Sequence, residues 1–289
     1  MPLDLSHYGS LPGWRCCVRL LSPHYRRALR CVAIILALCL GFAASACDAA
    51  PAPRAGAAIL VYHRFGPKAA STTVSDAALD IQLAWLARHV RVEPLRDVIA
   101  ALRAGDIAAG RACVAITADD GHRSVYTDLF PRILRYRLPV TLFIYPSAIS
   151  NASYALTWPE LAEMQASGLV DVQSHTYWHP NFHQEKARRT PDDYRAFVTM
   201  QLVRSKQVLE ARTGRTVNML AWPFAIHDAE LEAAASRAGY TTAFLLGNQP
   251  ALPTDDMLAL PRIWVSDADH DAQLARTIGS ACPIDAGRN

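Results

Sequence analysis

From residue 59 onward, short apolar runs alternate with longer segments in which apolar residues recur at helical spacing. Runs of four or five apolar residues predict buried strands, and leucines three or four apart, such as Leu79, Leu83 and Leu86, predict amphipathic helices. The predicted strands cover residues 59–62, 114–117, 140–144, 169–173, 218–221, 241–246 and 260–265. The predicted helices cover residues 77–89, 94–104, 124–136 (with Ser124 as the cap), 158–167, 191–212 and 228–238. Strands separated by helices pair in parallel, so the pattern predicts an α/β layer or barrel.

The first 47 residues differ from this pattern. Residues 31–47 contain no charged side chain, follow the basic residues Arg26, Arg27 and Arg30, and end in small residues before Cys47. This arrangement is typical of a secretory signal, and its 17 uncharged residues are short for a membrane span of about 20. Cys47 also resembles a lipidation site, while an uncleaved membrane anchor is the alternative. We therefore expect export to the periplasm or cell envelope, with membrane association through the N-terminus as an open question.

The chain divides into four predicted parts: residues 1–47 as signal or anchor, 48–57 as a linker rich in Ala and Pro, 58–280 as one domain, and 281–289 as a tail. Removing the signal leaves Cys47, Cys113 and Cys282. A disulfide between Cys113 and Cys282 is permitted in an exported protein, but the sequence does not indicate one.

Composition excludes two classes of protein. Hydrophobic residues make up 51% of the chain and charged residues 19%, which excludes a disordered protein. The net charge is +3, but residues 1–47 contribute five Arg against one Asp, so the remaining residues are near neutral at −1. A near-neutral domain lacks the basic surface of a nucleic-acid binder, and we expect no nucleic-acid partner.

Two polar clusters follow predicted strands, where α/β folds gather their functional groups. Asp119 and Asp120 precede Gly121, which allows a turn, and adjacent carboxylates beside a buried strand require a cation or a proton. A helix-capping turn is the alternative. His175 and His179 are four residues apart, a spacing that brings two imidazoles to one face of a helical turn. Two histidines and a carboxylate form a three-ligand metal site, although unrelated loop histidines are an alternative in a chain with 10 of them.

Together these clusters resemble the polysaccharide deacetylases of the NodB-homology type, carbohydrate esterase family four. The first family motif, Thr-Phe-Asp-Asp-Gly, is similar to residues 117–121, and the second, His-Ser/Thr-x-x-His-Pro, is matched in full by residues 175–180. Residues 59–65, 222–224 and 261–263 are similar to the branch that includes exported poly-N-acetylglucosamine deacetylases. The resemblance covers roughly residues 57–265 and implies a distorted, incomplete (β/α) barrel.

The resemblance also implies the site and the reaction. Asp120, His175 and His179 would hold one divalent metal ion, expected to be Zn²⁺, and Asp119 would be the general base. The backbone N–H of Phe224 would stabilise the oxyanion. The implied activity is hydrolysis of N-acetyl groups on an extracytoplasmic glycan, first of all an N-acetylglucosamine polymer. A noncatalytic glycan-binding relative, or a deacetylase or amidase acting on another acetylated substrate, is the alternative.

The chain departs from the family pattern at four points, and two of them leave roles to be filled. Ala118 and Ala225 stand where the family has Phe and Gly. The Arg that usually orients the base is missing from the third motif, and Arg262 is expected to replace it unless it is an ordinary surface residue. The Leu-x-His general-acid motif is absent too, and His270 is the selected candidate, with His227 as the other. For His270 and His227 the alternative is a solvated loop residue without a catalytic role. Tyr62 and His63 either line the same cavity or pack in the core.

Overall fold

The computed structural model describes residues 56–109, 113–279 and 281. The predicted signal segment, the linker up to residue 55, Cys47 and Cys282 lie outside these residues. Cys113 is buried before the second central strand and is disulfide-bonded, and no other cysteine lies in the described ranges. Within the same ranges, no helix combines the length and apolar character needed to cross a bilayer.

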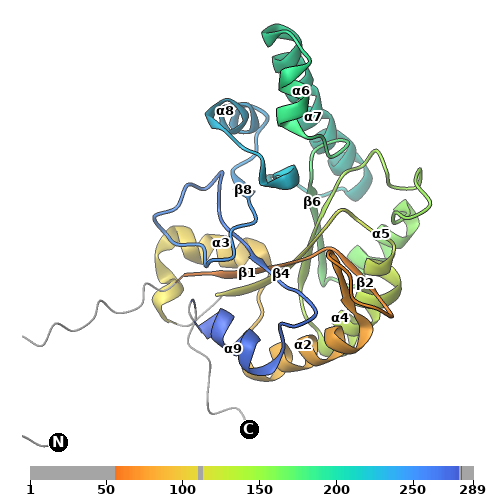
Figure 1. Cartoon of the computed structure of the whole chain (residues 1–289), viewed down its shortest axis with the longest axis vertical. Helices are drawn as coiled ribbons and strands as arrows, with labels where there is room; N and C mark the ends of the chain where they lie inside the picture. The colour runs from red at the N-terminus through yellow and green to blue at the C-terminus, as the bar shows by residue number, and fades with distance from the viewer. Residues whose placement is uncertain (1–55, 110–112, 280, 282–289) are drawn as a thin grey trace, which may run out of the picture. The chain divides into compact units, whose positions relative to one another are not determined.

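A seven-stranded parallel sheet forms the centre of the domain, in the order β8-β7-β6-β5-β4-β1-β9 (Figure 1). The strands are β1 (Ala58–Tyr62), β4 (Val114–Asp119), β5 (Val140–Ile144), β6 (Val170–Ser174), β7 (Met219–Ala221), β8 (Thr242–Phe244) and β9 (Ile263–Trp264). Every residue of β1, β4 and β5 is buried, as is typical of parallel strands covered on both faces. The curved sheet and its surrounding helices form an incomplete (β/α) barrel, which confirms the predicted fold class.

The helices connect these strands and cover them. They are α2 (Asp76–His89), α3 (Leu95–Ala104), α4 (Phe130–Tyr136), α5 (Trp158–Ala166), α6 (Phe182–Ala187), α7 (Pro191–Thr213), α8 (Ala229–Arg237) and α9 (Asp271–Gly279). Helix α9 packs beside α2 (Figure 1), and α8 contacts α7. Two short strands, β2 (Arg64–Gly66) and β3 (Thr73–Ser75), form a separate parallel pair.

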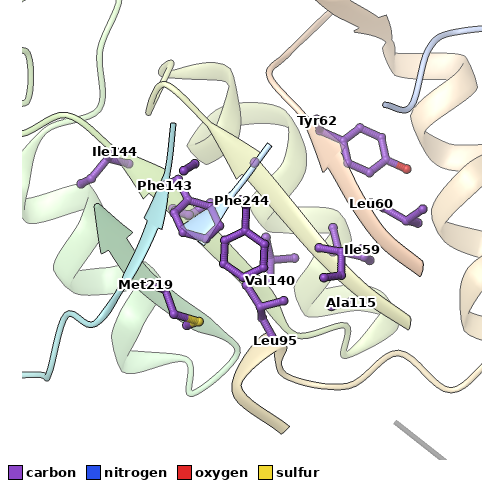
Figure 2. Close-up of a cluster of buried hydrophobic side chains, with 14 of the residues drawn as sticks. Ile59, Leu60, Tyr62, Leu95, Ala115, Val140, Phe143, Ile144, Met219 and Phe244 are labelled. Carbon is purple, nitrogen blue, oxygen red and sulfur yellow. The ribbon is translucent and has the colours of Figure 1, made fainter. Parts of the chain in front are cut away.

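The core lies between the sheet and these helices and also fills the concave side of the sheet. Phe143 of β5 and Phe244 of β8 lie with ring centroids 5.3 Å apart, and Figure 2 shows them among the side chains of the central strands. Both rings are fully buried. These aromatic rings therefore form an apolar layer next to the carboxyl ends of the strands.

Three local predictions were wrong. Ser124 does not cap a helix, because its hydroxyl instead accepts a hydrogen bond from the Phe65 amide, and the following residues Val125–Leu129 form a wider turn before α4. The strand predicted over residues 260–265 shortens to β9, since Pro261 has no amide hydrogen to donate to a neighbouring strand. Helices α6 and α9 were not predicted at all.

The segment between β8 and β9 connects the two edge strands of the sheet. Leu260 bridges to Phe244 of β8, and three residues later Ile263 pairs with Leu60 of β1. The residues in between, Pro261 and Arg262, are buried. This crossing places Arg262 in the interior of the barrel.

Candidate metal centre and active site

The site lies at the carboxyl ends of β4, β6 and β7. Asp119 is the last residue of β4, and Asp120 follows in the left-handed region with φ of 72°. Gly121 continues the turn at φ of 69°, where an added Cβ would lie 3.0 Å from a methyl group of Ile144. The turn separates two adjacent carboxylates, so that each has a different set of neighbours.

Asp120, His175 and His179 come together as one ligand set. The Asp120 Oδ1 atom lies 3.7 Å from His175 Nε2 and 3.6 Å from His179 Nε2. One donor atom from each residue lies within 4.8 Å of the others, which leaves space for a cation between them. One carboxylate oxygen and two imidazole nitrogens fit a divalent metal ion with an open coordination position.

The two histidines are fixed by backbone geometry rather than by a helix. Residues 175–181 form a loop in which Thr176 and His179 have positive φ values of 64° and 63°. The expected helical turn was wrong, because these two left-handed residues are what aim both rings at Asp120. Such conformations are costly outside glycine and concentrate at functional sites.

His175 has the environment of a neutral metal ligand. It is buried, and its Nδ1 lies 2.7 Å from the carbonyl oxygen of Ala221 on β7. Nδ1 therefore carries the hydrogen and donates it, which leaves the Nε2 lone pair facing Asp120. Burial, with a further contribution from His179, lowers the pKa of His175 to about 3.

Asp119 is held by a buried ion pair. Its two carboxylate oxygens accept hydrogen bonds from the two terminal nitrogens of Arg262, at 2.8 and 2.6 Å. Arg262 is only 1% exposed, also donates to Thr117 Oγ1 at 3.1 Å, and lies over the rings of Phe143 and Phe244. Burial alone would raise the pKa of Asp119, but the guanidinium outweighs it and lowers that pKa to about 2.

Asp120 has the opposite electrostatic balance. Burial raises its pKa, and the charge of Asp119 adds to this effect, while the His63 ring and two arginines oppose it. A carboxylate in this environment gains from a cation at its open side. The two adjacent residues thus divide into an ion-paired carboxylate and one that still needs a positive partner.

His63 is a member of this cluster to which the sequence assigned no definite place. It follows β1, whose register sets Tyr62 beside Ala118, and its ring lies 4.6 Å from that of Trp264. Its Nδ1 is buried and has no hydrogen-bond partner in the described part of the chain. Burial lowers its pKa, while the charges of Asp119 and Asp120 pull the pKa upward. The signal for His63 was its position one residue beyond a central strand.

The other candidates lie in different surroundings. Phe224 is 60% exposed, with φ of 57°, and its ring packs edge-on at 4.6 Å from that of His179. His270 precedes α9, its side chain is 46% exposed, and its Nδ1 lies 3.3 Å from Asp271. His227 bonds with Glu232 at 2.8 Å. Among the described residues, neither ring forms a hydrogen bond with Asp119 or Asp120.

Comparisons with known proteins agree with this geometry. Residues 106–243 match the model of the family described as polysaccharide deacetylase. The chain is 22% identical over 212 residues to a poly-beta-1,6-N-acetyl-D-glucosamine N-deacetylase of Staphylococcus aureus MRSA252, covering 72% of each chain. It is 24% identical over 200 residues to the enzyme of the same name from Staphylococcus epidermidis RP62A, covering 68% of each.

Two solved structures share the fold. The Streptococcus pyogenes deacetylase PplD, in complex with acetate, superimposes with a TM-score of 0.69 at 21% identity and covers 78% of this chain and 99% of its own. IcaB from Ammonifex degensii gives a TM-score of 0.65 at 23% identity, covering 78% and 97%. Residues 106–243 thus match the polysaccharide deacetylase family, and the two solved structures show that the described domain shares the fold of these deacetylases.

Proposed function

We propose that this domain hydrolyses N-acetyl groups of a glycan outside the cytoplasm, with an N-acetylglucosamine polymer as the substrate. The observation that carries the proposal is the pairing of an ionised, Arg262-bound Asp119 with the adjacent triad of Asp120, His175 and His179. A glycan-binding protein has no need for a buried, oriented carboxylate beside a cation site. The names of the staphylococcal relatives support the choice of polymer.

Asp120, His175 and His179 would hold one divalent ion, and their two nitrogens and one oxygen suit Zn²⁺. When bound, the ion would polarise the acetamide carbonyl and make a nearby water more acidic. The hydrogen bond from His175 to Ala221 keeps that ring in the tautomer a metal ligand needs.

The chain's own groups account for the proton movements of the reaction. Asp119 accepts a proton from the attacking water, whose oxygen bonds to the carbonyl carbon, and Arg262 keeps Asp119 ionised and oriented for this task. The backbone N–H of Phe224 donates to the carbonyl oxygen as it becomes negative. The C–N bond then breaks, acetate leaves with the new oxygen, and the amine nitrogen takes up a proton.

We assign the final protonation to His63 rather than to His270. His63 has a buried Nδ1 without a partner among the described residues and interacts electrostatically with both Asp119 and Asp120. His270 instead faces solvent beside Asp271. A histidine can donate a proton from a ring nitrogen, and the charges of Asp119 and Asp120 favour the protonated ring of His63 against the effect of its burial.

We further propose that residues 1–47 export the protein to the periplasm or cell envelope. Their basic, apolar and small-residue order supports this assignment. Lipidation of Cys47 and retention of the apolar segment are the two routes to membrane association.

The decisive experiment measures metal content and acetate release from N-acetylglucosamine oligomers in the same preparations. Asp119→Asn should keep the metal and lose turnover by roughly 10²- to 10⁴-fold, because an amide cannot accept the proton. Asp120→Asn and His175→Ala should lose metal, since each leaves two of three ligands. His183→Ala, a substitution on α6 outside the triad, is the matched control and should change neither quantity.

Two results would contradict the proposal. An Asp119→Asn protein with full turnover would remove the base from the mechanism. A wild-type protein that binds the oligomers but releases no acetate in the presence of Zn²⁺, Co²⁺ or Ni²⁺ would favour the noncatalytic glycan-binding alternative.

A further inference from the structure

A cluster of four side chains lies beside the metal triad and has no part in the chemistry described above. It consists of Arg64, His122, Tyr145 and Tyr154, and we call it the Tyr154 subsite. The Tyr145 ring lies 5.4 Å from that of His179, and its hydroxyl bonds with that of Tyr154 at 3.0 Å. The His122 ring stacks on that of Tyr154, with 14° between the ring planes. The subsite therefore continues directly from a metal ligand.

The subsite has the form of a sugar-binding surface. Tyr154 is 45% exposed although it is fixed by contacts to both Tyr145 and His122, so one rigid aromatic side chain is available to solvent. The turn below it is tied to the barrel, because Arg123 N donates to Tyr154 O at 2.8 Å and Leu156 N to Gly121 O at 2.9 Å. Rigid amphipathic rings bind with little loss of conformational entropy. A sugar unit adjoining the one bound at the metal would contact this surface.

Arg64 gives the subsite a positive charge. Arg64 begins β2, two residues after the end of β1, and its charge acts on Asp120, where it opposes the burial-induced rise in pKa. The next residue, Phe65, donates its amide hydrogen to Ser124 Oγ, which bonds with His122 Nδ1 at 2.9 Å. The Arg64 side chain is exposed and forms no ion pair or side-chain hydrogen bond with the described residues. Burial lowers the pKa of His122 and the charge of Arg64 adds to this effect, while the same charge opposes the burial-induced rise in the pKa of Tyr145.

We propose that the Tyr154 subsite accepts a neutral N-acetylated sugar next to the reacting unit and disfavours a sugar that has already been deacetylated. This inference rests on the proposed function. Deacetylation converts a neutral acetamide into an amine that is protonated at neutral pH, and Arg64 repels that cation. Arg64 has no ion-pair partner among the described residues, and its charge acts on the groups of the subsite as well as on Asp120. The product would then carry its free amines apart from one another rather than in runs.

The test uses β-1,6-linked trisaccharides in which the middle unit is always N-acetylated. One of the two end units carries either an acetamide or a free amine. Both positional isomers of the free-amine compound are compared with the fully acetylated one by the ratio of kcat/KM values. At pH 6.5 the wild-type kcat/KM should be roughly three- to tenfold higher for the fully acetylated compound than for the isomer whose amine lies at Arg64. The other isomer should show no such difference. The ratio should approach unity at a pH at which the amine is neutral.

Variants assign the preference to Arg64. Arg64→Met should lose most of it, and Arg64→Lys, which restores the charge, should retain it. Lys68→Met is the matched control, since Lys68 is an exposed cation four residues further along that should not alter the ratio. Because each enzyme is compared with itself, a general change in turnover cancels.

The outcomes separate this inference from the function on which it rests. Acetate release from all substrates at equal wild-type rates, or an unchanged preference in Arg64→Met, would overturn the subsite alone. Absence of acetate release from every substrate would overturn the proposed function and the subsite with it.

Discussion

Two neighbouring carboxylates of identical chemistry receive opposite environments at this site. Asp119 is buried against a guanidinium, whereas Asp120 is turned by a left-handed backbone toward two neutral imidazoles. The sequence could identify both residues through their motif, and it could name Arg262 as a candidate partner. For His63 it left two alternatives, a cavity-lining residue or a core residue, because a histidine after a strand is common. The register that sets Tyr62 beside Ala118 brings His63 to the cluster.

Replacing Arg262 tests the ion pair. In Arg262→Met, Asp119 stays buried without a cation, so its pKa should rise well above about 2 and turnover should fall by roughly 10²-fold or more. The acidic limb of the pH–rate profile should shift to higher pH, while metal content is retained because the triad is intact. Arg262→Lys keeps a positive charge but loses the bidentate geometry. Its turnover and pH–rate profile should therefore lie between those of the wild type and those of Arg262→Met.

Arg96→Met is the control for that experiment. Arg96 also donates two hydrogen bonds to one carboxylate, from its Nε to Asp171 Oδ2 at 3.1 Å and from a terminal nitrogen to Asp171 Oδ1 at 3.4 Å, but it does so on an exposed surface. Its replacement should leave the pH–rate profile in place. An Arg262→Met enzyme with a wild-type profile would mean that another group holds Asp119.

At the scale of elements, the strands of the central sheet and most helices followed from the apolar pattern, whereas the pair β2 and β3 and the helices α6 and α9 did not. Strands β1, β4 and β5 were predicted because continuous apolar runs are distinctive, and α7 because it is long and ends at Gly214. The metal-ligand loop has no such pattern. Its shape comes from tertiary contacts with α7, where Arg204 lies over Tyr177 and the fully buried Gln201 accepts a hydrogen bond from the Trp178 amide at 3.1 Å.

Helix α7 should therefore influence metal affinity although it supplies no ligand. Gln201→Met removes the acceptor for the Trp178 amide and should weaken metal binding by about tenfold, which is at the low end for residues that orient ligands. Competition with a chelator measures this directly. Gln207→Met, on an exposed part of the same helix, is the matched control. Equal affinity in both variants would show that the loop holds its shape without α7.

For the whole molecule, the site makes stability depend on pH. His175 has its pKa lowered to about 3, chiefly by burial, and Asp119 has its pKa lowered to about 2 by Arg262. In both cases the unfolded chain binds protons more readily than the folded one, so folding stability is lost as pH falls. For His175 the loss begins near the ordinary histidine pKa of about 6.5, and for Asp119 it begins near about 4.

Chelator-treated protein should therefore lose unfolding free energy below about pH 6.5, with a slope approaching 1.4 kcal/mol per pH unit for one proton. Denaturant titrations between pH 7.5 and 4.5 measure the slope. In His175→Gln the side chain no longer titrates, and the slope between pH 6.5 and 4.5 should be shallower. An equal slope in both proteins would mean that other groups cause the acid sensitivity.

The ion pair at the centre of the site also joins two distant points of the chain, since Arg262 follows Asp119 by 143 positions. During synthesis, β4 and both histidines are complete long before residue 262 leaves the ribosome. Until then Asp119 has no guanidinium partner, and a lone carboxylate is poorly accommodated in the buried position that Asp119 occupies. The barrel interior can reach its final packing only after the β8–β9 segment has docked. The contact between Asp119 and Arg262 is thus the last part of the site to form, which delays compaction of the barrel interior until the β8–β9 segment is present.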